Sequence, residues 1–446
     1  MTTTGDTFEA RLPSTPAGEK ARWLMTWTRR RGVGLTLEET ERAWAGLPER
    51  FAFERYRDGF GWVADQLGEG FTVEALTVDD PLVVVAVVAS AASGRRLEWW
   101  VRVSPEPPHG ITGHRLQRVL PAGVSIRPAR PEDGTALREV ANRAPVRLND
   151  AIVVIDPGDD YFGACRLMGD TAVTFVATHD GQPIGIHCGV SFPIRLEGRD
   201  GTCCLIAHSR LLPEHSGGGI WGRLNDAVFD HFQSLGGWQV PLAYVRPDNA
   251  SAQRLGGAEA RWPTRPFRAV IDCAASASTG AGRPATPDDA PRIVELLNGF
   301  HAAEEFFVPY TGDRLVERLE RAPELYGWHN VRLGERAVVG VWARGERHTR
   351  IPDEGSPTTT VRAAVLDYGC EPGGEAELEA LLRAECARLI PLGITHLGVF
   401  SSSASPAAEL LSSMAAMIEE YDLMPPGIPE PQSVARHGVY VDPVYF

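Results

Sequence analysis

The feature that most constrains the fold of this 446-residue chain is an internal repeat. The segment IRPARPEDGTALREVAN, which begins at Ile126, has a counterpart in GRPATPDDAPRIVELLN, which begins at Gly282. Arginine, proline, aspartate and asparagine positions match at a constant offset of 156 residues. The same offset relates NASAQRL, from Asn249, to SPAAELL, from Ser405. Matches at one spacing over this length predict two copies of one domain in tandem.

The repeat divides the chain into three predicted domains, 1–122, 123–273 and 280–446. Two or three domains are typical of a chain of this length. In the first domain, a helical pattern spans 51–67. Four apolar or β-branched runs follow it, at 71–76, 82–88, 97–103 and 115–120. This order favours an α+β module with an antiparallel meander, and we recognise no catalytic constellation in it.

Each repeat copy is predicted to begin with a short strand and an acidic helix start, which suits the positive end of a helix dipole. A long helix, a hairpin, a central strand, a second helix and a further strand follow. In the first copy the hairpin is expected at 173–190, the central strand at 203–211, the second helix at 221–235 and the further strand at 239–245. In the second copy the hairpin is expected at 331–343, the second helix at 375–389 and the further strand at 396–400. The predicted class is α+β or mixed α/β: an N-terminal α+β module plus two mixed sheets with helices on both faces.

Net charge and cysteine content limit the classes of partner that we expect, by disfavouring nucleic acids and metal ions. The formal net charge is −14, and Lys20 is the only lysine. An acidic chain disfavours a nucleic-acid partner, because it repels polyphosphate. The seven cysteines show no CxxC spacing, so we expect buried thiols and no metal site. No apolar run approaches the roughly 18 residues of a membrane span, and the N-terminus has no signal-peptide pattern. A cytoplasmic protein without a membrane partner is the expectation.

The segment LLPEHSGGGIW, residues 211–221, is the most informative for chemistry. Three glycines between a strand and a helix allow several backbone N–H groups to face one point, where the helix dipole adds positive potential. Such a turn can bind phosphate without lysine. It is neither a Walker loop nor a complete GxGxxG motif. Taken alone, the turn fits a flexible helix entry equally well.

The order strand, PEHSGGGI, helix, strand and an Asn-x-x-Ala helix start resembles the GNAT acyltransferase superfamily. Its pyrophosphate motif, (Gln/Arg)-x-x-Gly-x-(Gly/Ala), matches residues 214–219, with Gly217 and Gly219 in the glycine positions. The resemblance implies an acetyl-CoA or other acyl-CoA co-substrate. It also implies cofactor contacts along the segment: Ser209, Arg210 and Leu211 for the pantetheine arm; Ser216, Gly217, Gly218, Gly219, Ile220 and Trp221 for the pyrophosphate; and Asn249 beside the cofactor.

The sequence departs from the family pattern at three places. Glu214 and Ser216 stand where charge-assisted phosphate contacts are usual, although serine keeps a hydroxyl donor. Trp221 replaces a small residue, and its ring either narrows the site or turns into the core. Gly256 stands where the family often has a tyrosine that protonates the leaving thiolate. The usual general acid is therefore missing from its expected place.

The catalytic groups are less well defined. His208 is a candidate base, with a buried core histidine as the alternative, and backbone N–H groups near Leu211 are candidates for polarising the thioester carbonyl. Glu214 and His215 are better read as exposed helix-cap residues. Several acidic and polar residues follow the first helix: Asn149, Asp150, Asp159, Asp160 and Tyr161. They either face a cationic acceptor or form a solvated loop, and the solvated loop is the stronger interpretation.

The second copy lacks the glycine motif. Its counterpart, LDYGCEPGGEAELEALL, places Glu371 and Glu375 at the would-be phosphate site, and Ser405 replaces the asparagine. Negative charge there opposes pyrophosphate binding, so this copy is expected not to hold CoA productively.

The sequence therefore favours an N-acyltransferase that transfers acetyl from acetyl-CoA to the amine of a small molecule by direct attack. Two alternatives remain: a carrier-protein or aminoacyl-tRNA donor, and a non-catalytic protein that binds a ligand or partner. The oligomeric state stays open, a homodimer included.

Overall fold

The computed structural model describes residues 11–47, 53–67, 70–90, 92–168, 172–250, 252–253, 261–343, 347–353, 358–425 and 430–442. The contact pattern divides the chain into two compact units. One contains residues 1–122 with 217–223, and the other contains 123–216 with 224–446. No helix among the described residues is long and apolar enough to cross a membrane.

The N-terminal unit contains a four-stranded antiparallel sheet with the strands in chain order, as the meander pattern predicted. Its elements are α2 (Pro16–Arg29), α3 (Leu37–Ala43), α4 (Phe53–Leu67), β1 (Phe71–Asp80), β2 (Val83–Ser90), β3 (Arg96–Val103) and β4 (Ile111–Arg118). Alternate residues of β2 and β3 are buried, among them the fully enclosed Trp99. Burial on every second residue gives the sheet one packed face.

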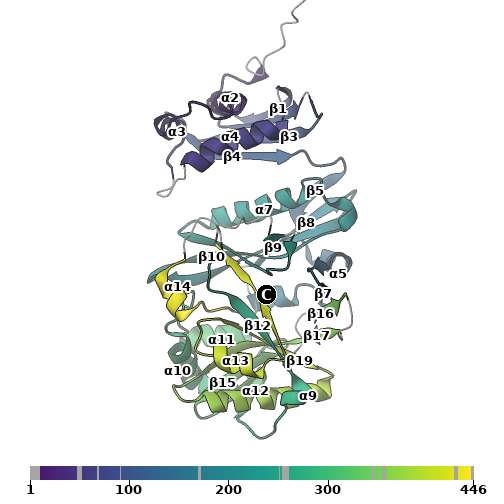
Figure 1. The fold of residues 1–446 in the computed structure, drawn as a ribbon, viewed down its shortest axis with the longest axis vertical. Coiled ribbons are helices and arrows are strands. Elements are labelled where there is room, and N and C mark those ends of the chain that lie inside the picture. The colour runs from purple at the N-terminus through teal and green to yellow at the C-terminus, as the bar shows by residue number, and fades with distance from the viewer. Residues whose placement is uncertain are drawn as a thin grey trace, which may run out of the picture. The chain divides into compact units, whose positions relative to one another are not determined.

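The second unit contains a six-stranded sheet in the order β21-β11-β10-β9-β8-β5. Its strands are β5 (Val124–Pro128), β8 (Ala172–His179), β9 (Gln182–Leu196), β10 (Arg199–Leu211), β11 (Gln239–Val245) and β21 (Asp422–Met424). Helix α5 (Gly134–Arg143) and helix α7 (Ile220–Leu235) lie on opposite faces of this sheet (Figure 1). The pleat agrees: a Cβ at Gly189 would meet Val228 and Phe232 of α7, and successive side chains of a strand point to opposite faces.

A second, seven-stranded sheet follows the order β13-β14-β15-β18-β19-β12-β20. Its strands are β13 (Arg283–Pro284), β14 (Val331–Leu333), β15 (Ala337–Trp342), β18 (Ala363–Cys370), β19 (His396–Ser402), β12 (Pro266–Asp272) and β20 (Met417–Glu420). The helices of this part are α9 (Cys273–Ser276), α10 (Ala290–His301), α11 (Gly312–Glu320), α12 (Glu375–Leu389), α13 (Ala408–Met414) and α14 (Gln432–His437). Both sheets are mixed, as expected, because one neighbouring pair in each is parallel.

The two sheets exchange strands. Strand β12, which ends the first repeat copy, lies between β19 and β20 in the second sheet. Strand β21, near the end of the second copy, pairs with β11 in the first sheet. The domain limits 123–273 and 280–446 stay a prediction, and neither range contains all the strands of its sheet.

A third sheet is also shared between the copies. It has the order β17-β16-β7-β6, and β7 (Ala151–Asp156) of the first copy pairs along six residues with β16 (Arg347–Pro352) of the second. The remaining elements are β6 (Val146–Arg147), α6 (Gly163–Met168) and β17 (Thr359–Val361).

The residues that match in sequence adopt the same local structure. Arg127 donates two hydrogen bonds to the Asp133 carboxylate, and Arg283 does the same to Asp289, in each case just before the first long helix. These bonds hold the pKa of both carboxyl groups below the ordinary value of an aspartate, to about 2 for Asp133. The constant offset thus corresponds to a repeated helix-entry structure.

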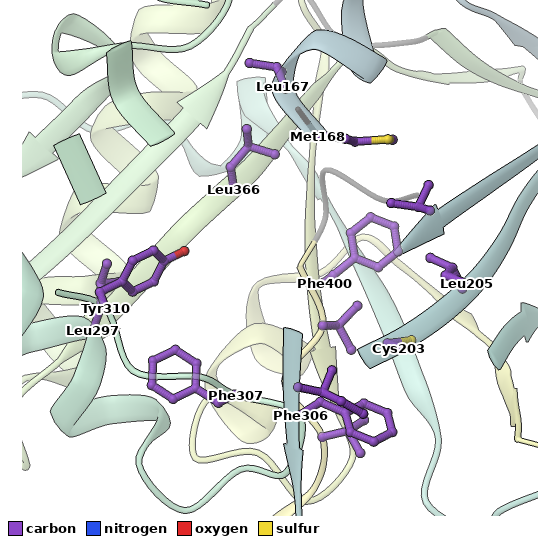
Figure 2. Close-up of a cluster of buried hydrophobic side chains, with 14 of the residues drawn as sticks. Leu167, Met168, Cys203, Leu205, Leu297, Phe306, Phe307, Tyr310, Leu366 and Phe400 are labelled. Carbon is purple, nitrogen blue, oxygen red and sulfur yellow. The ribbon is translucent and has the colours of Figure 1, made fainter. Parts of the chain in front are cut away.

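One hydrophobic core joins the two copies (Figure 2). Cys203 and Leu205 of β10 belong to the same buried cluster as Phe306 and Phe400 of the second copy. The two sheets are therefore sides of one core.

We predict that Gly189→Ala lowers the free energy of unfolding by about 1–3 kcal/mol, because overpacking forces a tight core to shift. The added Cβ would lie 2.4 Å from Val228 Cγ1 and 2.8 Å from Phe232 Cζ. The control is Gly299→Ala in α10, where a Cβ meets nothing within 4 Å. That change should raise stability by about 0.5–1 kcal/mol, since alanine is the better helix former. Urea denaturation would contradict the prediction if both variants shifted alike.

Candidate active site

Strands β10 and β11 separate at the centre of the first sheet. Their parallel pairing runs from Thr202 with Gln239 to Ile206 with Ala243, and ends there. Beyond this point β10 continues beside β9 to Leu211, while β11 continues beside β21 to Val245. Beyond this point the facing edges of β10 and β11 no longer pair with each other. Backbone N–H and C=O groups on these edges can therefore pair with an extended ligand.

A β-bulge marks the same point. The register of β10 on β9 shifts between Ala207 and Arg210, so His208 and Ser209 form the irregularity. His208 has a φ of +49°, in the left-handed region that residues other than glycine adopt at a cost. The structure therefore places the predicted base at the bend of the central strand, where it lines a small surface hollow.

Ser209 points to the other face of the strand. Its hydroxyl lies 2.7 Å from Nδ1 of His187, a fully buried residue of β9. Burial lowers the pKa of His187 to about 4, against a hydrogen bond with Asn225 that raises it. At neutral pH the imidazole is uncharged, and it orients the serine hydroxyl at the bulge. Nothing in the sequence pattern had indicated His187, because the pairing depends on strand register.

The glycine turn follows the strand directly. Residues Pro213–His215 form a single 3-10 turn, and Gly217 and Gly219 have φ of +86° and +78° before α7 begins at Ile220. Ser216 donates its backbone N–H and its hydroxyl to the carbonyl of Pro213, at 3.1 and 2.8 Å. Its hydroxyl thus supports the turn. The two positive φ angles explain why glycine is needed at both positions.

Other predicted residues have defined roles in the described structure. Glu214 is ion-paired with Arg143 of α5 at 2.8 Å, so its negative charge is compensated. Asn249 begins a short turn after β11, where its Oδ1 accepts the N–H of Ala252 at 3.2 Å. Gly256, where the family often has tyrosine, lies outside the described residues.

The acidic segment after α5 is ion-paired to arginines. The pairs are Asp150 with Arg350, Asp156 with Arg138 and Arg347, Asp159 with Arg138, and Asp160 with Arg166. These carboxylates are therefore already neutralised by side chains of the chain itself. Tyr161 lines the hollow beside His208.

The corresponding position of the second copy is occupied by side chains. The register of β18 on β15 shifts at Leu366, and the next residue, Asp367, is buried. Its carboxylate accepts hydrogen bonds from Tyr326 Oη at 2.6 Å, Tyr310 Oη at 3.1 Å and Arg318 Nε at 3.2 Å. Arg318 also pairs with Asp442 at 2.8 Å. This network holds the Asp367 carboxylate in the core directly after the bulge of the second copy.

The turn of the second copy satisfies its own donors. The N–H of Gly373 donates to the Glu375 carboxylate at 3.2 Å, and the N–H of Gly374 donates to the carbonyl of Glu371 at 2.8 Å. These amides are therefore engaged where the first copy has its glycine turn. Among the described residues, no cluster of His, Cys, Asp and Glu could hold a metal ion.

We predict that stability falls as the pH is lowered from about 6.5 to 4, partly through His187. The unfolded chain protonates this histidine near its ordinary pKa of 6.5, whereas the folded chain does so only near 4. The stability present above pH 6.5 is lost progressively, by roughly 3 kcal/mol in total. His187→Asn should flatten the decline in denaturation curves at pH 7 and 4.5, whereas the exposed control His329→Asn should leave it unchanged. Parallel curves for all three proteins would refute this role.

We also predict that Arg318→Met destabilises the fold by about 3–5 kcal/mol, because it leaves the buried Asp367 and the largely buried Asp442 without their cation. The control, Arg195→Met, removes an exposed pair with Asp200 and should cost at most about 1 kcal/mol. Equal midpoints in chemical denaturation would contradict the structural role of Arg318.

Comparison with known proteins supports the fold. No family model and no curated protein matches the sequence. Two crystal structures of Saccharomyces cerevisiae N-myristoyltransferase with bound myristoyl-CoA match over 76% of this chain, at 9% identity. Their TM-scores are 0.52 and 0.50, over 87% and 92% of the respective chains. A GCN5-related N-acetyltransferase from Sphaerobacter thermophilus has a TM-score of 0.45 and 14% identity, over 70% of this chain and 99% of its own.

The fold assignment rests on the N-myristoyltransferase structures, together with the bulge, the separated parallel strands and the glycine turn. N-myristoyltransferase is itself a GNAT-fold enzyme. The chain therefore has a GNAT fold in a tandem-like arrangement.

Proposed function

We propose that the protein is an acyl-CoA-dependent N-acyltransferase, and that its donor is acetyl-CoA and its acceptor the amine of a small molecule. The observation that carries this proposal is the separation of β10 from β11 at a bulge, directly before a glycine turn that leads into a helix. One stretch of chain thus offers an open strand edge for an amide-bearing arm and a glycine turn for a phosphate.

The strand edge would hold the donor through its backbone. Residues 209–211 of β10 lie beyond the end of the parallel ladder, so backbone groups on their open edge could pair with the pantetheine arm as a neighbouring strand would. The carbonyl of Ser209 already accepts a hydrogen bond from the Arg210 guanidinium at 2.7 Å. The turn at 216–221 would receive the pyrophosphate on backbone N–H groups, with no lysine required. The pairing of Glu214 with Arg143 reduces the repulsion between this carboxylate and a pyrophosphate at the turn.

Catalysis would rest mainly on positioning. Holding the thioester carbon and the amine about 3–3.5 Å apart can supply roughly 7–11 kcal/mol. A backbone N–H near Leu211 would polarise the thioester carbonyl. The acceptor ammonium must lose a proton at a cost of roughly 4–5 kcal/mol at pH 7, and His208 at the bulge is the proposed base, directly or through water. The amine then attacks the thioester, and CoA leaves as thiolate.

The second copy would act as a scaffold without productive CoA. Arg318 and Asp367 pair in the core directly after its bulge, and its turn amides are engaged within the turn. We therefore expect one acetyl-CoA per chain by native mass spectrometry, and release of free thiol with a library of small amines. Two bound molecules would contradict the role of the second copy. Failure of free CoA to compete with donor binding would favour a carrier-protein or aminoacyl-tRNA donor.

We predict that Gly217→Val and Gly219→Val each weaken acetyl-CoA binding at least tenfold in calorimetry. Valine is strained at φ of +86° and +78°, so the turn must change its path. The matched control is Gly198→Val in the β9–β10 turn, which has a φ of +73° and open space around it. The Gly198→Val substitution imposes similar backbone strain away from the site. The affinity of this variant for acetyl-CoA should equal that of the wild type. Unchanged affinity in both Gly217 and Gly219 variants would remove the assignment.

A further inference from the structure

The surface hollow at the bulge lies on the face of the sheet opposite α7. Gly185 and Gly189 of β9 face Leu224 and Val228 of α7. Ile186 lies between them in the strand and therefore points the other way, toward α5. The residues that line the hollow come from α5, from β7 and the loop after it, from β9 and from β10: Ala141, Ile155, Pro157, Tyr161, Ile186, His208 and Arg210.

The position of the hollow separates it from the glycine turn. The turn leads into α7, and the hollow opens on the α5 face of the same strand. An acyl donor paired with the open edge of β10 would lie in the plane of the sheet. The second reactant can then reach the bulge from the α5 face, where His208 lines the hollow.

The lining of the hollow is mostly apolar, with one permanently charged group. Ile155, Pro157 and Ile186 form apolar walls, and the described lining contains no carboxylate. The aspartates of the neighbouring segment are each paired with an arginine. The guanidinium of Arg210 donates to the carbonyl of Ser209 at 2.7 Å, so it is held close to the bulge. A cationic acceptor finds no carboxylate among these residues, whereas an anionic group finds a cation.

We propose that the acceptor is an amino acid with an apolar side chain, whose carboxylate is bound by Arg210 while its amine reaches the bulge. This inference rests on the proposed acyltransferase function. His208 and Arg210 line the same hollow on either side of the bulge residue Ser209. An α-amino acid can place its carboxylate on Arg210 and its amine toward His208, with the side chain on the apolar walls. Arginine suits the carboxylate, because its planar group binds both oxygens.

The test compares two product-like ligands that differ in the carboxylate. Calorimetry with the full-length protein and CoA measures the affinity for N-acetyl-L-phenylalanine and for N-acetylphenethylamine. We expect the carboxylated compound to bind at least tenfold more tightly to the wild type. Arg210→Gln should bring the ratio close to one, Arg210→Lys should keep part of it, and the control Arg195→Gln should leave it unchanged.

Three outcomes overturn the proposal: equal or tighter binding of the uncharged compound, a ratio that Arg210→Gln leaves intact, and no binding of either compound at millimolar concentration. Circular dichroism and melting of each variant identify a folding defect, in which case Arg210→Lys alone decides. These outcomes are separate from the proposed function, which fails if acetyl-CoA does not bind, if no amine releases thiol from it, or if the Gly217 and Gly219 variants both keep wild-type affinity.

Discussion

The exchange of strands between the two repeat copies is the constraint on which the rest of the second unit depends. Strand β12 completes the second sheet between β19 and β20, and β21 completes the first sheet beside β11. The pairing of β21 with residues 243–245 begins where β11 leaves β10. The second copy therefore satisfies one edge of β11 exactly where the other edge opens. Without this strand, the end of β11 beyond Ala243 would have no strand partner on either edge, and its backbone groups would need other hydrogen-bond partners.

The two copies share one architecture and use its bulge differently. In the first copy the bulge carries His208 and Ser209, and it borders a hollow. In the second, Asp367 follows the bulge and is held by Arg318 and two tyrosines. A buried carboxylate needs such partners, because an isolated charge in the interior is strongly unfavourable. The ion pair thus makes the segment after this bulge part of the core.

The proposed site also illustrates how a chain of net charge −14 could bind anionic groups. The glycine turn offers neutral N–H donors, and Glu214 is compensated by Arg143. The aspartates near the hollow are compensated by arginines, and the lining also contains Arg210, which donates to the carbonyl of Ser209. Net charge therefore describes the average surface, while local pairing decides the charge that a ligand meets.

The sequence alone predicted the N-terminal meander and the main helices and strands of each repeat copy, because these depend on local periodicity and turn residues. It did not predict the strands of the third sheet or the exchanged strand β21. The meander of the N-terminal unit, the hairpin before β10 and the helix after the glycine turn lie close to their predicted ranges. The repeat offset was readable from Arg127, Asp133 and their counterparts, which form the same helix entry. Only the tertiary structure decided the strand exchange, the pairing of Ser209 with His187 and the network around Asp367. These join residues distant in the chain, and their formation depends on register and burial, for which no local pattern provides a signal.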